Sequence, residues 1–247
     1  MSDLSAPPRL YRIDVVDHVG RAYRTVFDHV RFVFEIALLP YLIVLSVELV
    51  SLLFTHGGTV GRIAAALIHA VGLLLFGAVF VVRLHRLVLL GETVGGELPP
   101  PGWREFVTAG IKVGLAVIAG WVLLVAIALL PPGVITVPAT AAGGVALTLS
   151  VLRVSLIFPA AAIGRPVTLR TAWDWVAGNF WRLFGAAFAC YFPFVVLQML
   201  ISPLASAFPS LTWVVFEAVR LAVSFAGAAV VAALLSHLYR DLAAEAT

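Results

Sequence analysis

The chain has few of the residues that soluble proteins place at their surface. Only 12% of its 247 residues are charged, about half of the ~25% typical of a soluble domain. Hydrophobic residues make up 62%, and the mean hydropathy is +1.07. A soluble protein of this composition would expose large apolar patches and aggregate. We therefore expect a protein whose solvent is the lipid bilayer.

Residues for covalent and metal chemistry are also scarce. The single cysteine, Cys190, excludes an intramolecular disulfide, a metal site made from cysteine pairs and c-type haem attachment. The sequence has no Walker phosphate loop, no HExxH zinc motif and no GxSxG nucleophile motif. We therefore expect no cofactor and no metal, and we predict that the chain is not an enzyme.

Six long apolar runs fill most of the chain. Each has about the ~20 residues that a helix needs to cross a ~30 Å hydrocarbon core. They cover residues 32–54, 63–82, 113–130, 134–156, 183–204 and 211–235. Little polypeptide remains outside them, so the sequence predicts a single all-α integral-membrane domain over residues 1–247, a polytopic bundle of six helices. The first thirty residues carry charges throughout, so we expect the first run to act as an uncleaved insertion signal.

Basic residues lie in alternate loops. One set of segments, which includes both chain ends, holds Arg9, Arg12, Arg21, Arg24, Arg31, Arg83, Arg86, Arg104, Lys112, Arg165, Arg170, Arg182 and Arg240; the opposite loops hold Arg62 alone. The positive-inside rule therefore predicts a multi-pass protein with both termini in the cytoplasm. The preference for arginine over lysine, with many Ala, Val, Leu and Gly residues, favours a bacterial inner membrane. Basic loops also suit anionic headgroups, so the net charge of +3 does not indicate a nucleic-acid partner.

The loops and the segments before the spans suggest a repeated unit. Short outer loops rich in turn residues predict three tight helical hairpins. Amphipathic segments at about 15–31, 103–111 and 172–183 precede them on the cytoplasmic side, and the third has Thr171 and Asp174 at capping-box spacing. Their arginines and aromatics suit helices in the headgroup region, although extensions of the spans are the alternative. The units would cover residues 14–86, 103–156 and 168–240.

Four titratable residues within the spans form the first candidate site. Glu48, His69, Glu217 and Arg220 all lie about six to nine residues from the outer ends of their spans, roughly 9–14 Å deep. Charged groups there are costly and often functional. One interpretation is a polar site open to the outside, where Glu48 and His69 exchange protons. The other is a buried structural network in which Arg220 neutralises the two glutamates.

A second candidate group lies at the inner ends of the spans. Arg83, Arg86 and Arg153 are near enough to the boundary for their side chains to reach the headgroups. We predict that they contact lipid phosphates.

Several short motifs resemble those of a known family. They are FPAAAIGRP at residues 158–166, AW at 172–173, GNFWRLF at 178–184 and SHLYRDL at 236–242. This pattern resembles bacterial inner-membrane proteins, alphaproteobacterial ones above all, and is similar to the glycerophosphoryl diester phosphodiesterase membrane-domain family. The resemblance implies a multi-helix membrane module. In two-domain relatives hydrolysis belongs to a separate soluble barrel. We expect no such barrel in this sequence, so the resemblance implies no catalytic residue here.

These observations predict a noncatalytic inner-membrane protein that acts as a scaffold, an accessory subunit or an envelope-homeostasis factor. Its expected partners are anionic membrane lipids and a membrane protein. The alternative is a small transporter or carrier of lipids or other hydrophobic molecules that uses the outer polar group. A lipid-modifying enzyme is a third option.

Overall fold

The computed structural model describes residues 12–55, 58–93, 98–128, 136–207 and 212–245, and every regular element in these ranges is helical. The elements are α1 (Val15–Asp28), α2 (Val30–Thr55), α3 (Gly58–Gly72), a π-helical segment η1 (Leu73–Gly77), α4 (Ala78–Leu90), α5 (Trp103–Ala128), α6 (Thr136–Val154), α7 (Ile157–Ala162), α8 (Leu169–Trp175), α9 (Phe180–Ala207) and α10 (Thr212–Glu245).

Six stretches of helix are long and apolar enough to cross a bilayer, which confirms the predicted number of spans. They are Val30–Ser51, Gly58–Leu90, Trp103–Ile127, Pro138–Ala162, Phe180–Pro203 and Val214–Ala243. The second span is built from α3, η1 and α4 together, and the fourth from α6 and α7.

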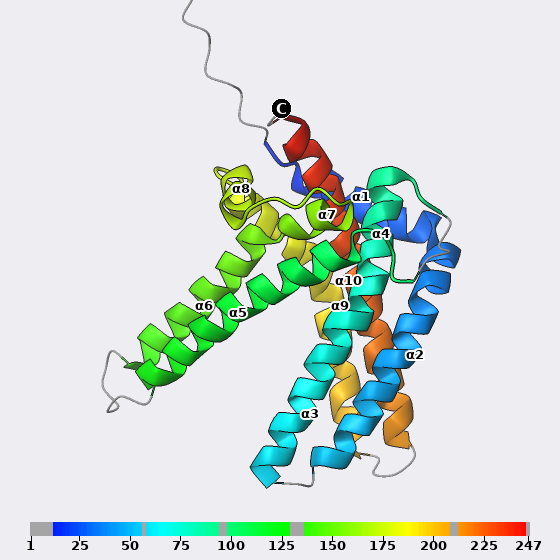
Figure 1. Cartoon of the computed structure of the whole chain (residues 1–247), viewed down its shortest axis with the longest axis vertical. Helices are drawn as coiled ribbons and strands as arrows, with labels where there is room; N and C mark the ends of the chain where they lie inside the picture. Colours follow the sequence, from blue (N-terminus) through cyan, green and yellow to red (C-terminus); the bar gives the residue numbers. More distant parts are fainter. Residues whose placement is uncertain (1–11, 56–57, 94–97, 129–135, 208–211, 246–247) are drawn as a thin grey trace, which may run out of the picture.

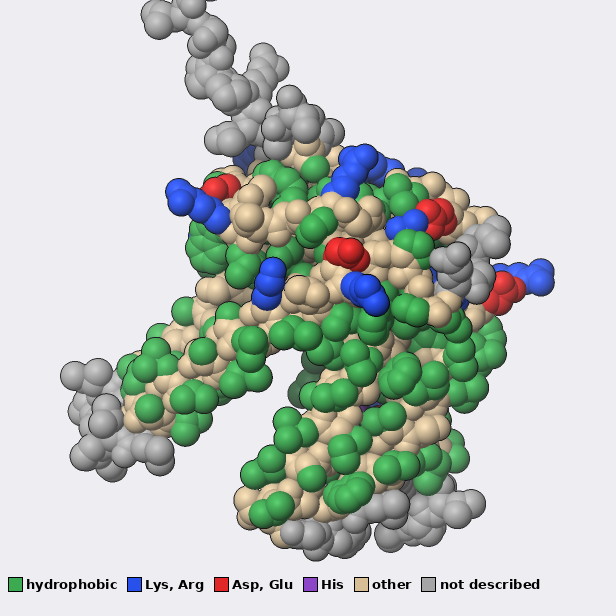
Figure 2. Space-filling view, in the orientation of Figure 1, with side chains coloured by type: hydrophobic (Ala, Val, Ile, Leu, Met, Phe, Trp, Pro, Cys, Tyr) green, Lys and Arg blue, Asp and Glu red, His purple; other side chains and the backbone are tan. Residues whose placement is uncertain are grey.

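The spans form a main bundle and a leaning pair (Figure 1). In the main bundle α10 is central, since it contacts α1, α2, α4, α7 and α9. The most apolar window of the α10 span is 56% buried, against 11% for the α5 span. Helices α5 and α6 pack along each other but lean away from the bundle, and Figure 2 shows an open cleft between the two groups. The pair joins the bundle where α5 meets α4, η1 and α7.

Charged side chains gather at one end of the molecule (Figure 2). Helix α1, the α4–α5 connection, α8 and the last turns of α10 lie there (Figure 1). We call this the charged end. The opposite end, where α2 finishes and α3 starts, is the apolar end. The alternating arginines predicted this separation, and the assignment of the charged end to the cytoplasm stays a prediction.

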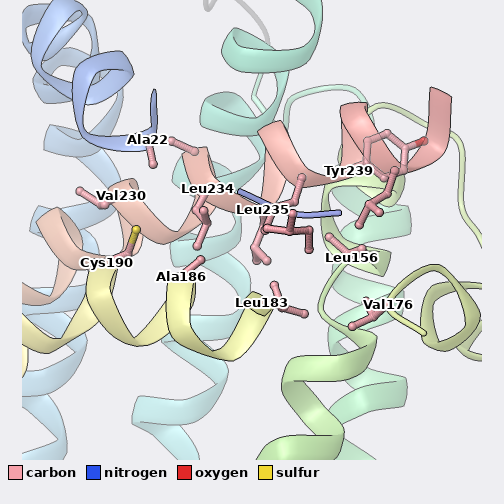
Figure 3. Close-up of a cluster of buried hydrophobic side chains, with 14 of the residues drawn as sticks. Ala22, Leu156, Val176, Leu183, Ala186, Cys190, Val230, Leu234, Leu235 and Tyr239 are labelled. Carbon is pink, nitrogen blue, oxygen red and sulfur yellow. The ribbon is translucent and has the colours of Figure 1, made fainter. Parts of the chain in front are cut away.

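A buried core near the charged end joins α1, α9 and α10 (Figure 3). Its side chains are small where helices approach: Ala22, Ala186, Cys190 and Ala233 are all fully buried. Small residues let helix backbones come close, so that van der Waals contact can hold helices together in lipid, where no hydrophobic force drives them to associate.

The second span contains an irregular turn, and its neighbours fit around it. A π-helical turn shifts the backbone hydrogen bonding, which frees a carbonyl for another donor. The indole Nε1–H of Trp103, at the start of α5, donates to the Leu75 carbonyl within η1 at 3.1 Å. Beside this turn Gly72 lies against α2, and a Cβ there would come within 2.7 Å of the Val47 side chain. The irregular turn thus positions both α2 and α5.

The three segments predicted to precede the hairpins take three different forms. The first is a separate helix, α1, which ends at Asp28. The second, residues 103–111, forms the first turns of α5, so the prediction of a separate helix there is wrong. Nothing ends a helix in this stretch, because it contains no proline and its helical sequence continues into the span. The third is α8 and the start of α9, with Gly178 between them at φ +78°.

The capping box predicted for the third segment is also wrong. Helix α8 begins after Thr168, whose extended backbone and side chain form the cap, and its hydroxyl accepts a hydrogen bond from the Thr171 N–H at 3.1 Å. Asp174 lies in the last turn, 4.0 Å from Arg170. The Ser/Thr cap signal was therefore present three residues earlier than the predicted one.

Candidate functional site

Three of the four charged residues expected at one level form a single cluster. Arg220 of α10 donates from Nη2 to Glu48 of α2, and from Nε to Glu217 on the preceding turn of α10. The Glu48 side chain is 9% exposed and that of Glu217 is 17% exposed. We call these three residues the acid–arginine cluster. It ties α2 to α10 in the apolar-end half of the bundle.

His69 of α3 lies near the cluster but is not bonded to it. It interacts electrostatically with Glu48, yet it makes no hydrogen bond to any described residue. The structure therefore places all four residues in one region, and it joins only three of them directly.

The cluster has more negative than positive groups. Two carboxylates share one guanidinium, and Glu48 Oε2 is buried without a hydrogen-bond partner among the described residues. An unpaired buried charge is costly, so a further positive group nearby stabilises the arrangement. His69 is placed to supply that charge when it is protonated.

Two polar residues that the sequence analysis did not select extend the cluster to α9. Ser224 Oγ donates to the Arg220 carbonyl at 3.1 Å and accepts from Gln198 Nε2, also at 3.1 Å. Gln198 is the single glutamine of the chain and lies within the apolar span Phe180–Pro203. That isolation was a usable signal, because a lone amide within a span usually bonds to a neighbouring helix.

At the charged end, Arg86 forms hydrogen bonds within the protein. Its Nε and Nη2 donate to the carboxylate of Glu92 at 2.7 and 2.6 Å, and Nη1 contacts the carbonyls of Pro101 and Ala162 at 3.3 Å. Gly102 makes this approach feasible: at φ +81°, a Cβ would meet the Ala162 carbonyl oxygen at 2.2 Å. Arg86 thus holds the α4–α5 connection against α7.

Arg153 is held by aromatic rings. Its guanidinium carbon lies 4.1 Å from the ring centre of Trp173 on α8 and 5.5 Å from that of Phe180 on α9. Cation–π contacts of this kind are worth about 0.5–2 kcal/mol. Arg83 is half-buried on α4. The predicted contact of these three arginines with lipid phosphates stays a prediction, and Arg86 and Arg153 already have partners in the protein.

A polar network between α1 and α10 was not predicted. Asp241 Oδ2 accepts from Arg21 Nη2 at 2.9 Å and lies 3.2 Å from Nε2 of the buried His18. One turn along each helix, Thr25 Oγ1 and His237 Nε2 are 2.9 Å apart. The network fixes α1 across the end of α10.

His85 of α4 and Ser236 of α10 form a buried pair at 2.7 Å. Ser236 Oγ already donates to the Ala232 carbonyl at 2.8 Å, so the proton between the pair belongs to His85 Nδ1. His85 Nε2 is then an acceptor, and it is buried without a partner among the described residues. The pair links α4 to α10 but leaves one lone pair unsatisfied.

Comparison with protein-family models, with curated proteins and with solved structures found no match to this chain. The resemblance to the phosphodiesterase membrane-domain family therefore stays an expectation from short motifs.

Proposed function

We propose that the chain is a noncatalytic protein of the bacterial inner membrane that serves as a scaffold or accessory subunit in envelope homeostasis. Both termini would be cytoplasmic, and the charged end would lie on anionic headgroups. Exposed basic side chains at that end, among them Arg104, Lys112 and Arg165, can meet phosphate, together with the exposed rings of Trp173 and Trp181. Arginine and tryptophan at one level are typical of a membrane interface.

The observation that carries the proposal is the pairing within the acid–arginine cluster. Arg220 pairs with both carboxylates, and this pairing connects α2 to α10. Three apolar hollows formed by described residues have linings that do not include Glu48, Glu217 or Arg220. Groups that only join helices support a structural role.

One observation favours the alternative of a small transporter or carrier. Glu48 Oε2 lacks a partner among the described residues and His69 is nearby, so a proton could pass between them if water reached the cluster. The two functions therefore differ in one measurable property, the access of water to His69 from the apolar end.

Cysteine labelling tests this difference. In a Cys190→Ala background, His69→Cys and Thr59→Cys are each treated with a water-soluble, charged thiol reagent in intact membranes. Thr59 is exposed at the start of the same helix, so it is the matched control. We expect rapid labelling at position 59 and little at position 69. Equal rates at the two positions would show a water path to the cluster and would favour the transporter.

A further inference from the structure

An apolar groove of about 590 Å³ runs between α1 and α2 on one side and α9 and α10 on the other. Its volume lies within the ~300–1,000 Å³ of ligand sites. Among the side chains that line it are Phe27, Phe34, Tyr41, Phe194, Phe225 and Ala226. Phe27 is 69% exposed and Phe34 is 65% exposed, so the groove opens sideways toward the surrounding membrane.

The two hydroxyl groups on the groove wall already donate hydrogen bonds within the protein. Tyr23 Oη donates to the Cys190 carbonyl at 3.0 Å, and Tyr41 Oη donates to the Ala218 carbonyl at 2.8 Å. A polar ligand would find few partners on these walls, and its desolvation would go uncompensated. The walls therefore suit hydrocarbon.

The groove has the length and direction of a lipid chain. On α10 its lining extends from Ala222 to Val230, which is about 12 Å at 1.5 Å per residue. It ends at the α1–α2 junction, at the charged end of the molecule. A neighbouring transmembrane helix would need a seam closer to the ~30 Å thickness of the hydrocarbon core. A single acyl chain that extends from the headgroup level into the bilayer fits the dimensions of the groove better than a helix does.

Charges of both signs lie on α1 and on the first turns of α2, next in sequence to residues that line the groove. Arg31 is balanced by Glu35 at 3.0 Å, and the His29 ring bonds through Nδ1 to the Thr25 carbonyl. Arg24 and Asp28 are exposed and have no ion-pair partner among the described residues. The two unpaired groups offer one positive and one negative charge to whatever covers them.

We propose that this groove binds one zwitterionic phospholipid with a primary ammonium group. An acyl chain fills the groove, the phosphate meets Arg24 and the ammonium meets Asp28. This site goes beyond the proposed function and does not depend on it, because a scaffold and a carrier can both hold such a lipid.

The test is lipid retention in native mass spectrometry. The protein is reconstituted with equal amounts of phosphatidylethanolamine and phosphatidylglycerol of matched acyl chains and is then extracted in mild detergent. We expect one bound phosphatidylethanolamine per chain. Ala226 is exposed and lines the groove, so the large side chain of Ala226→Trp should fill it. This variant should lower the occupancy of the groove by lipid about tenfold, the equivalent of about 1.4 kcal/mol. Ala116→Trp, at an exposed position on α5, is the matched control and should retain the lipid.

A second variant tests the headgroup. Arg24→Gln combined with Asp28→Asn alters only exposed side chains, so it keeps the test valid even if Ala226→Trp does not fold. It should bind the two lipids without preference. The proposal is overturned if the wild type binds phosphatidylglycerol equally well, if Ala226→Trp keeps full occupancy, or if the groove is covered by a second copy of the chain and no lipid is held.

Discussion

Arg220 connects two carboxylates on different spans, and each of the three groups depends on the others. In hydrocarbon no water solvates an unpaired charge, so an unpaired charge there has a high free-energy cost. The buried pair of His85 and Ser236 likewise joins two helices, α4 and α10. At the scale of single residues, polar groups in the spans act mainly as links between helices.

Replacement of Arg220 by methionine should destabilise the protein by about 3 kcal/mol, because it leaves two carboxylates without a cation. This loss lies at the lower end of the range for buried pairs, because the Arg220 side chain is 34% exposed. The melting midpoint in detergent should fall by about 6–12 °C. Arg62→Met, at an exposed position, should melt like the wild type. Glu48→Gln added to Arg220→Met should recover part of the loss. Identical melting of all variants would mean that the cluster does not hold α2 to α10.

Helix α1 is attached to the bundle by contacts at its start and along its length. At its start the Ile13 N–H donates to Asn179 Oδ1 at 3.1 Å, and Arg182 Nη1 donates to the Ile13 carbonyl at 2.8 Å. Farther along, Arg21 bonds to Asp241 of α10. The motif at residues 178–184, on which part of the family resemblance rests, therefore has a structural role, because two of its side chains hold the beginning of α1.

Asn179→Ala should loosen α1 without unfolding the bundle. It removes the buried hydrogen bond from the Ile13 N–H, worth about 1 kcal/mol, so amide exchange in residues 15–28 should speed up about fivefold while exchange in α10 is unchanged. Hydrogen exchange followed by mass spectrometry measures both. Thr168→Ala removes only the cap of α8 and should leave α1 as it is. If the amides of α1 exchange at the wild-type rate in Asn179→Ala, the contacts made at the start of α1 do not hold this helix in place.

The whole molecule has one charged end and one apolar end, and it is divided into a main bundle and the leaning α5–α6 pair (Figures 1 and 2). The first feature follows from the arginine distribution. Because α5 and α6 lean away from the main bundle, much of their surface is left to contact lipid. On α5, the side chains of Leu115, Ile118 and Val122 are each at least 60% exposed.

The positive-inside rule makes a prediction for the whole molecule. Two exposed positions mark the two ends: Ala177, between α8 and α9, and Thr59, at the start of α3. For the proposed location in a bacterial inner membrane, the test uses a Cys190→Ala background. A membrane-impermeant maleimide should label Thr59→Cys in cells with an opened outer membrane and an intact inner one. It should label Ala177→Cys only after the inner membrane is lysed. The reverse pattern would invert the orientation.

Part of the candidate site was predictable from the sequence. Glu217 and Arg220 are three residues apart on one helix, a spacing that brings side chains together whatever the fold. The link to Glu48 required α2 to pack against α10, and it was expected only as one of two interpretations. The α1–α10 network was not predictable, because Arg21 and Asp241 are 220 residues apart and nothing local shows that they meet.

The sequence by itself determined six membrane-crossing helices and the gathering of charge at one end, because both follow from the transfer of each side chain between water and lipid, residue by residue. Only the tertiary structure decided which polar groups pair, that residues 103–111 belong to a span, and that α5 and α6 lean away. The physical reason is that helices associate in lipid through close packing and hydrogen bonds, and these depend on shape and register between distant segments.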